Sequence, residues 1–148
     1  MPINSVTELA RSRADSHGDK RIYTFLKNGE TEAGHLSFAE VDRASRAVAS
    51  TLQETTAAGE RVLLMYAPGL DFITGFLGCL YAGVVAVPAY APNPVRPERY
   101  MPRLSAIAAS AGTRTILTTS DQASRLQPLM REFKAFESAR ILDSDKFD

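Results

Sequence analysis

The chain has 148 residues, of which 45% are hydrophobic and 23% charged, so it is large enough to bury the core of one globular domain. Its 17 lysines and arginines balance its 17 aspartates and glutamates, which leaves no strong field to attract nucleic acid or an anionic membrane. The single cysteine, Cys79, excludes an internal disulfide and a multi-cysteine metal site and agrees with a reducing compartment, so we expect a cytoplasmic protein.

The first twenty residues are polar and charged where a signal peptide needs an apolar run, and they show no export signal. Ser5 is followed three residues later by Glu8, which is the spacing of a capping box. In this motif the hydroxyl and the carboxylate accept hydrogen bonds from unpaired backbone N–H groups. The pattern predicts a helix from about Ser5 to Asp15.

A β-hairpin is predicted next. The segment Arg21–Lys27 contains a run of β-branched and aromatic residues, and a second arm ends at Leu36. Between them, Asn28-Gly29 tolerates the positive φ angles of a two-residue hairpin turn.

A second capping box, Ser37 with Glu40, starts a helix that we expect to run to about Thr55. Its apolar residues recur at helical spacing, which predicts one buried face: Val41, Ala44, Val48 and Leu52.

The most apolar part of the chain predicts a strand, a helix and a second strand. Val62–Tyr66 is an unbroken apolar run of strand length, typical of a parallel strand covered on both faces. Pro68-Gly69 turns the chain into Leu70–Ala82, a helix that is apolar nearly all round and should therefore be buried. Gly83 ends this helix before the strand Val84–Val87. Glycines and turn signals interrupt the segment, so it belongs to a core and not to a membrane span.

The remaining chain starts with an extended, polyproline-like loop punctuated by Pro88, Pro92, Pro94 and Pro97. A helix should follow from Pro102 to Ala111, and Thr115–Thr118 should form a strand. Ser120–Lys134 reads as a helix that Pro128 kinks or splits, and Arg140–Leu142 as the start of a further strand. The prediction for residues 1–148 is a single α/β unit, with a mostly parallel sheet, flanking helices and an N-terminal hairpin.

Glycines in the buried helix have the spacing of a phosphate-binding P-loop, but its chemistry is missing. Gly78 and Gly83 are followed by Val84 and Val85, where lysine and serine or threonine would be needed. No G-x-G-x-x-G sequence occurs either. We therefore interpret these glycines as packing residues.

Residue types that often carry catalysis are isolated in this sequence. His17 and His35 form no metal motif, and both are expected at the surface. Cys79 lies within the predicted buried helix, where a thiol behaves as a small apolar side chain. The hydroxyl run Thr118-Thr119-Ser120 lacks the glycines and lysine of a phosphate loop and is expected to cap a helix. The sequence thus predicts no catalytic residue and no metal ligand.

The loop after the second strand carries the remaining candidates. Three arginines could bind an anion or could lie on a solvated loop with Glu98, and the second interpretation is favoured: Arg96, Arg99 and Arg103. For three tyrosines, packing against the protein is the favoured interpretation and lining a pocket is the alternative: Tyr81, Tyr90 and Tyr100.

Two motifs resemble the core motifs of adenylate-forming enzymes. Leu36-Ser37-Phe38-Ala39-Glu40-Val41 resembles the first, and Leu80-Tyr81-Ala82-Gly83-Val84-Val85-Ala86-Val87-Pro88 resembles the second at the expected distance. The residues that mark the family look structural and not reactive: Leu36, Glu40, Gly69, Gly78, Gly83 and Pro88.

Within that superfamily the stretch from Arg61 to Pro94 is similar to fatty acyl-AMP ligases, and the resemblance covers about residues 20 to 130. It implies that the chain is the N-terminal part of a larger AMP-binding domain. The family activates a fatty acid with ATP and Mg²⁺ and passes the acyl-adenylate to an acyl carrier protein or polyketide synthase module in lipid or polyketide biosynthesis.

The resemblance places the catalytic groups beyond Asp148, so this chain alone should be inactive, bind no cofactor and expose apolar surface meant for the remainder of the ligase. It would supply one wall of the acyl-binding region, near Tyr90, Arg96 and Tyr100. Two alternatives stay open: a non-catalytic interaction module on the same scaffold, or the N-terminal part of an acyl-CoA ligase.

Overall fold

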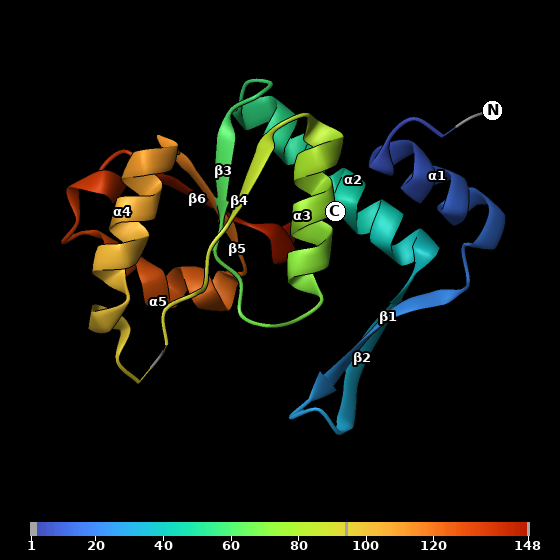
Figure 1. Cartoon of the computed structure of the whole chain (residues 1–148), viewed down its shortest axis with the longest axis horizontal. Coiled ribbons are helices and arrows are strands. Elements are labelled where there is room, and N and C mark those ends of the chain that lie inside the picture. Colours follow the sequence, from blue (N-terminus) through green and yellow to red (C-terminus); the bar gives the residue numbers. More distant parts are fainter. Residues whose placement is uncertain (1–2, 94, 148) are drawn as a thin grey trace.

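The computed structural model describes residues 3–93 and 95–147, in which a helix and a hairpin precede a four-stranded sheet with helices on both faces (Figure 1). The predicted fold class is therefore confirmed. Pro94, one of the predicted loop prolines, lies outside the described residues.

Helix α1 (Val6–His17) begins at the predicted cap. The Glu8 backbone N–H donates to Ser5 Oγ at 3.1 Å, while the Glu8 carboxylate accepts from the backbone N–H of Asn4 at 2.8 Å. The helix continues to His17, one half-turn beyond the predicted end at Asp15, because no residue there stops it.

Strands β1 (Arg21–Lys27) and β2 (Thr31–Ser37) form the predicted antiparallel hairpin. Asn28 and Gly29 have φ angles of 55° and 76°, as the predicted turn requires. Lys27 pairs with Thr31, so the connection is three residues long and not two.

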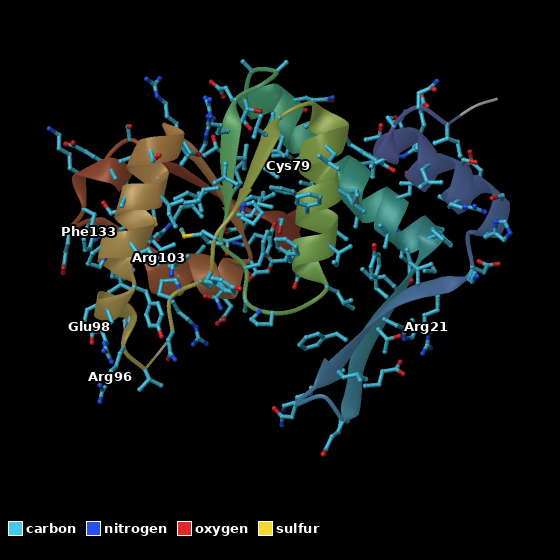
Figure 2. The ribbon with its side chains drawn as sticks, viewed as in Figure 1. Arg21, Cys79, Arg96, Glu98, Arg103 and Phe133 are labelled. Atoms are coloured by element: carbon cyan, nitrogen blue, oxygen red, sulfur yellow. The ribbon has the colours of Figure 1, made fainter. Side chains whose placement is uncertain are left out.

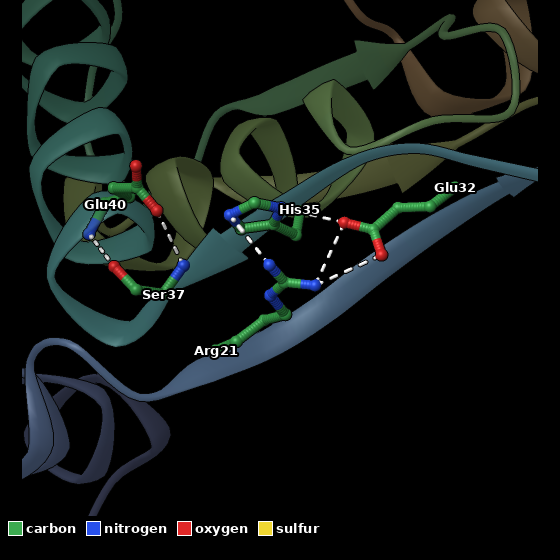
Figure 3. Close-up of polar contacts among 5 residues, drawn as sticks. All are labelled: Arg21, Glu32, His35, Ser37 and Glu40. Atoms are coloured by element: carbon green, nitrogen blue, oxygen red, sulfur yellow. Dashed lines mark hydrogen bonds and ion pairs between the residues drawn. The ribbon is translucent and has the colours of Figure 1, made fainter.

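Polar side chains join the two strands at the surface (Figure 3). Arg21 Nη1 donates to the Glu32 carboxylate at 2.9 and 3.1 Å, and His35 Nδ1 lies 3.0 Å from Glu32 Oε1. These side chains are about half exposed, so the contacts contribute little to stability.

Helix α2 (Phe38–Thr55) has the predicted bounds and a complete capping box, visible in Figure 3. Glu40 N–H donates to Ser37 Oγ at 3.3 Å, and Ser37 N–H donates to Glu40 Oε2 at 2.8 Å. The hydrogen bonds from the Ser37 backbone and side chain lower the pKa of the Glu40 carboxyl.

The sheet is entirely parallel, with the strand order β4-β3-β5-β6. Its strands are β3 (Arg61–Leu64), β4 (Val85–Pro88), β5 (Thr115–Thr118) and β6 (Arg140–Asp143). The prediction that Pro88 belongs to the loop is wrong: it pairs with Leu64 as the last residue of β4. A proline is tolerated there because β4 is an edge strand with no further neighbour among the described residues.

Helices cover both faces of the sheet. Helices α2 and α3 (Asp71–Ala82) pack on one face, against Val62, Leu64 and Leu117. Helices α4 (Met101–Ala111) and α5 (Ser120–Met130) pack on the other, against Leu63, Met65 and Ile116. This two-faced cover explains why the strands read as unbroken apolar runs.

Helix α3 is less completely buried than its apolar sequence predicts: Thr74, Gly75, Gly78 and Cys79 are buried, and most of its other residues are partly buried. The helix turns its small residues toward its neighbours, while its large apolar side chains, Phe76 and Leu77 among them, are only partly buried. A Cβ added at Gly78 would lie 2.6 Å from Val48 Cβ on α2, closer than real carbon atoms approach. Gly78 is thus a packing glycine, as predicted, and α2 and α3 cross at close range.

Two predictions in the last third of the chain need correction. Pro97–Arg99 forms a short 3₁₀ turn and is not extended, since proline fits the first position of such a turn. Helix α5 ends at Met130, four residues before Lys134, and Pro128 lies within its last turn. A proline without an N–H group weakens this turn, and Lys134–Phe136 forms a separate 3₁₀ turn.

Candidate substrate cleft

A cleft of about 840 Å³ opens beyond the carboxyl ends of β3 and β4. The chain adds β4 on one side of β3 and then crosses over to add β5 and β6 on the other side, so the direction in which strands are added reverses at β3. In open α/β sheets, ligands bind in the crevice at such a reversal. The cleft is lined by Tyr66, Ala67, Pro68, Gly69, Phe72, Pro88, Ala89, Tyr90, Ala91, Pro92, Asn93, Tyr100 and Gln122.

The chemistry of this lining is apolar. None of its described side chains carries a charge, and its polar side-chain groups are the tyrosine hydroxyls and the amides of Asn93 and Gln122. Such a surface suits an aliphatic or aromatic ligand with few polar groups. It offers no cation to neutralise a triphosphate.

Tyr66 is a buried member of the lining, with 6% of its surface exposed. Its ring meets Phe72 edge-to-face at 6.4 Å between centroids. Its hydroxyl donates to Ser144 Oγ at 2.8 Å, and Ser144 donates to the Thr118 carbonyl at 3.0 Å. Burial raises the pKa of Tyr66 far above its ordinary value, so the phenol stays protonated and remains a donor at neutral pH.

The first turn of α5 borders the cleft through Gln122, and an acidic residue caps it. Asp145 accepts from the Ser120 N–H at 2.8 Å and from the Ser120 hydroxyl at 2.6 Å. The hydroxyl run lies at the start of the helix as predicted, with Thr119 at the N-cap position, but it supplies no side-chain cap: Thr119 makes no such hydrogen bond, and Thr118 donates its hydroxyl to the Met65 carbonyl.

The predicted pocket residues are only partly brought together. Tyr90 and Tyr100 line the cleft, with 87% and 43% of their surfaces exposed, whereas Arg96 is exposed and absent from the lining. Arg96 and Glu98 both lie on the segment that leads into α4 (Figure 2), without an ion pair between them in the described residues. The role of Tyr90, Arg96 and Tyr100 as a substrate wall stays a prediction.

Among the family-marking residues, Gly69 and Pro88 also border the cleft. Sequence reasoning missed Tyr66, Phe72 and Gln122. The sequence placed Tyr66 at the end of a buried strand, and the signal that could have revealed its role is its position two residues before the Pro68-Gly69 turn.

Other candidate groups show no reactive environment. His17 and His35 are exposed, as predicted. Cys79 is fully buried on α3 (Figure 2), and burial raises the pKa of its thiol to about 12, so it is an inert packing residue. Across residues 3–93 and 95–147, no three His, Cys, Asp or Glu side chains gather where they could hold a metal ion. No described helix is long and apolar enough to cross a bilayer.

Comparison with known proteins supplies a family. The model of the AMP-binding enzyme family matches residues 10–148. The chain is 40% identical over 145 residues to the medium-chain-fatty-acid–[acyl-carrier-protein] ligase JamA of Moorena producens, covering 97% of this chain and 24% of that protein. It is 32% identical to the long-chain-fatty-acid–AMP ligase FadD32 of Mycobacterium marinum, covering 97% of this chain and 22% of that protein.

A solved structure agrees with these matches. The crystal structure of a fatty acyl-adenylate ligase from L. pneumophila, in complex with acyl adenylate and pyrophosphate, superposes with a TM-score of 0.83 at 32% identity. The superposition covers 97% of this chain and 24% of that one. The chain thus spans about a quarter of the length of the proteins it matches.

Proposed function

We propose, from the premise that the chain belongs to the AMP-binding enzyme family, that it holds the acyl chain of a fatty acid during ATP-dependent activation. In this reaction the carboxylate attacks the α-phosphate of ATP and pyrophosphate leaves; the phosphopantetheine thiol of an acyl carrier protein then takes the acyl group from the acyl-adenylate, and AMP leaves. The proposal rests on relatives whose names describe fatty-acid ligases.

The observation that carries the proposal is the uncharged cleft at the reversal of the sheet. Its walls are aromatic rings, prolines and alanines, and burial of an aliphatic chain there gains roughly 0.8 kcal/mol per methylene group. A charged carboxylate gains nothing from these walls. The acyl tail should therefore enter the cleft while its carboxylate faces outward.

The ATP and Mg²⁺ that the family resemblance implies do not fit the described residues. The cleft presents no cationic side chain to phosphates, and the described part of the chain gathers no set of acidic ligands for a metal ion. In this proposal other segments of a larger ligase bind ATP and Mg²⁺, and residues 1–148 alone do not catalyse.

The test is ATP–pyrophosphate exchange, measured on the protein expressed from its native reading frame and on residues 1–148 alone. We expect exchange that depends on added fatty acid for the first and none for the second. Addition of a phosphopantetheinylated carrier protein or of CoA to the first identifies the acceptor. Absence of fatty-acid-dependent exchange from the native product would contradict the proposed activity, and exchange by residues 1–148 would contradict their inactivity.

A further inference from the structure

Tyr66 belongs to the core and to the cleft at the same time. It follows the end of β3, packs in the cluster formed with α2 and α3, and also lines the cleft. By contrast Tyr90, on the outer part of the lining, is almost fully exposed. The two side chains therefore differ in how far they can move. The Tyr90 side chain can move aside for a ligand, whereas the Tyr66 side chain is enclosed by protein.

Three contacts hold the Tyr66 ring. Phe72 meets its side, and Ser144 accepts from its hydroxyl. On the α3 side, a Cβ added at Gly75 would lie 2.8 Å from two ring carbons and 2.5 Å from the hydroxyl oxygen. The absence of a side chain at this position is what allows the ring to approach the helix this closely.

We propose that the Tyr66 ring is the inner wall that limits the length of the acyl chain, and that Gly75 is a positioning residue that sets how far this wall stands from the cleft mouth. The inference rests on the function proposed above. A wall fixed on three sides cannot retreat, so each methylene that would overlap it carries a penalty. Discrimination by a rigid apolar pocket amounts to about 10- to 200-fold per methylene group.

Two substitutions move the wall in opposite directions. Tyr66→Leu removes the ring and should raise the ratio of kcat/KM for a longer acid to that for a shorter one by about tenfold or more. Gly75→Ala pushes the ring away from α3 toward the open side and should lower the same ratio by a similar factor. Tyr66→Phe keeps the ring, loses the bond to Ser144, and should leave the ratio nearly unchanged.

Gly78→Ala is the matched control for Gly75→Ala. Both glycines lie on α3 and both lack room for a Cβ, but Gly78 faces Val48 on α2 and does not border the cleft. Its substitution should lower stability without changing the preferred chain length. If Gly75→Ala shifts the preferred chain length and Gly78→Ala does not, the shift is therefore due to displacement of the Tyr66 ring and not to a general loosening of the fold.

The experiment measures pyrophosphate exchange across a series of saturated fatty acids, together with their binding by displacement of a fluorescent fatty acid. If the native product shows no fatty-acid-dependent exchange, the proposed function fails. If the native product does catalyse exchange, but Tyr66→Leu and Gly75→Ala keep the wild-type chain-length profile in both exchange and displacement, Tyr66 does not limit the chain length. The proposed function is then unaffected. If a variant folds too poorly for kinetic measurements, the displacement series on its folded fraction shows whether its chain-length preference has changed.

Discussion

Replacing Gly78 with alanine tests how closely α2 and α3 approach. In an exposed helix, this change stabilises the protein by about 1 kcal/mol because glycine is the poorer helix former. Here the new Cβ would lie 2.6 Å from Val48 Cβ and 3.2 Å from the Ser45 carbonyl oxygen. Val48 is 2% exposed and cannot turn away, so the two helix backbones must separate.

Overpacking of this kind costs about 3 kcal/mol at the upper end of its usual range, so the net loss of unfolding free energy should be about 2 kcal/mol. With a urea slope of roughly 2 kcal/mol/M, the unfolding midpoint should fall by about 1 M. Ala106→Gly, at an exposed site on α4, measures the helix-propensity contribution alone and should cost about 1 kcal/mol. A Gly78→Ala protein as stable as the wild type, or more stable, would refute the close crossing.

Two further substitutions and one labelling experiment test individual contacts. Ser37→Ala removes half of the α2 capping box and should lower the unfolding free energy by about 1 kcal/mol in urea titrations. Burial raises the pKa of the Asp145 carboxyl, but the hydrogen bonds from Ser120 outweigh burial and hold this pKa below its ordinary value. The ionised carboxylate therefore stabilises the fold at pH values above the pKa of the unfolded state. This stabilisation is lost as the pH falls through the lower pKa of the folded state. Asp145→Asn should therefore lower stability at pH 7 and flatten the acid side of the stability profile; an unchanged profile would count against the cap. Cys79 should react with a thiol reagent only after denaturation, and rapid labelling of the native protein would show that α3 is not packed as described.

Local signals in the sequence predicted most of the fold because each has a local physical cause. The capping box at Ser37 and Glu40, the positive-φ pair Asn28-Gly29 and the helix stop at Gly83 all act within a few residues. The apolar run that became β3 likewise indicated a strand covered on both faces. These elements agree with the structure to within one or two residues.

The errors arose where distant residues decide the outcome. Asp145 caps α5 from 25 residues away, and no pattern near Ser120 announces it. The incomplete burial of α3 follows from which residues the fold brings against it, Tyr66 at Gly75 and Val48 of α2 at Gly78. The lining of the cleft combines the segments after β3 and β4 with Gln122 of α5, so it could be assembled only once the strand order was known.

Photo-crosslinking can show whether the cleft beyond β3 and β4 holds an acyl chain. A fatty acid with a diazirine near its methyl end would be bound to the protein expressed from its native reading frame, irradiated, and mapped by peptide mass spectrometry. If the cleft holds the acyl chain, labels within this chain should fall on residues 66–72 and 88–93, nearest Tyr66, and excess unlabelled fatty acid should remove them. Competable labels found only outside the cleft lining would contradict it.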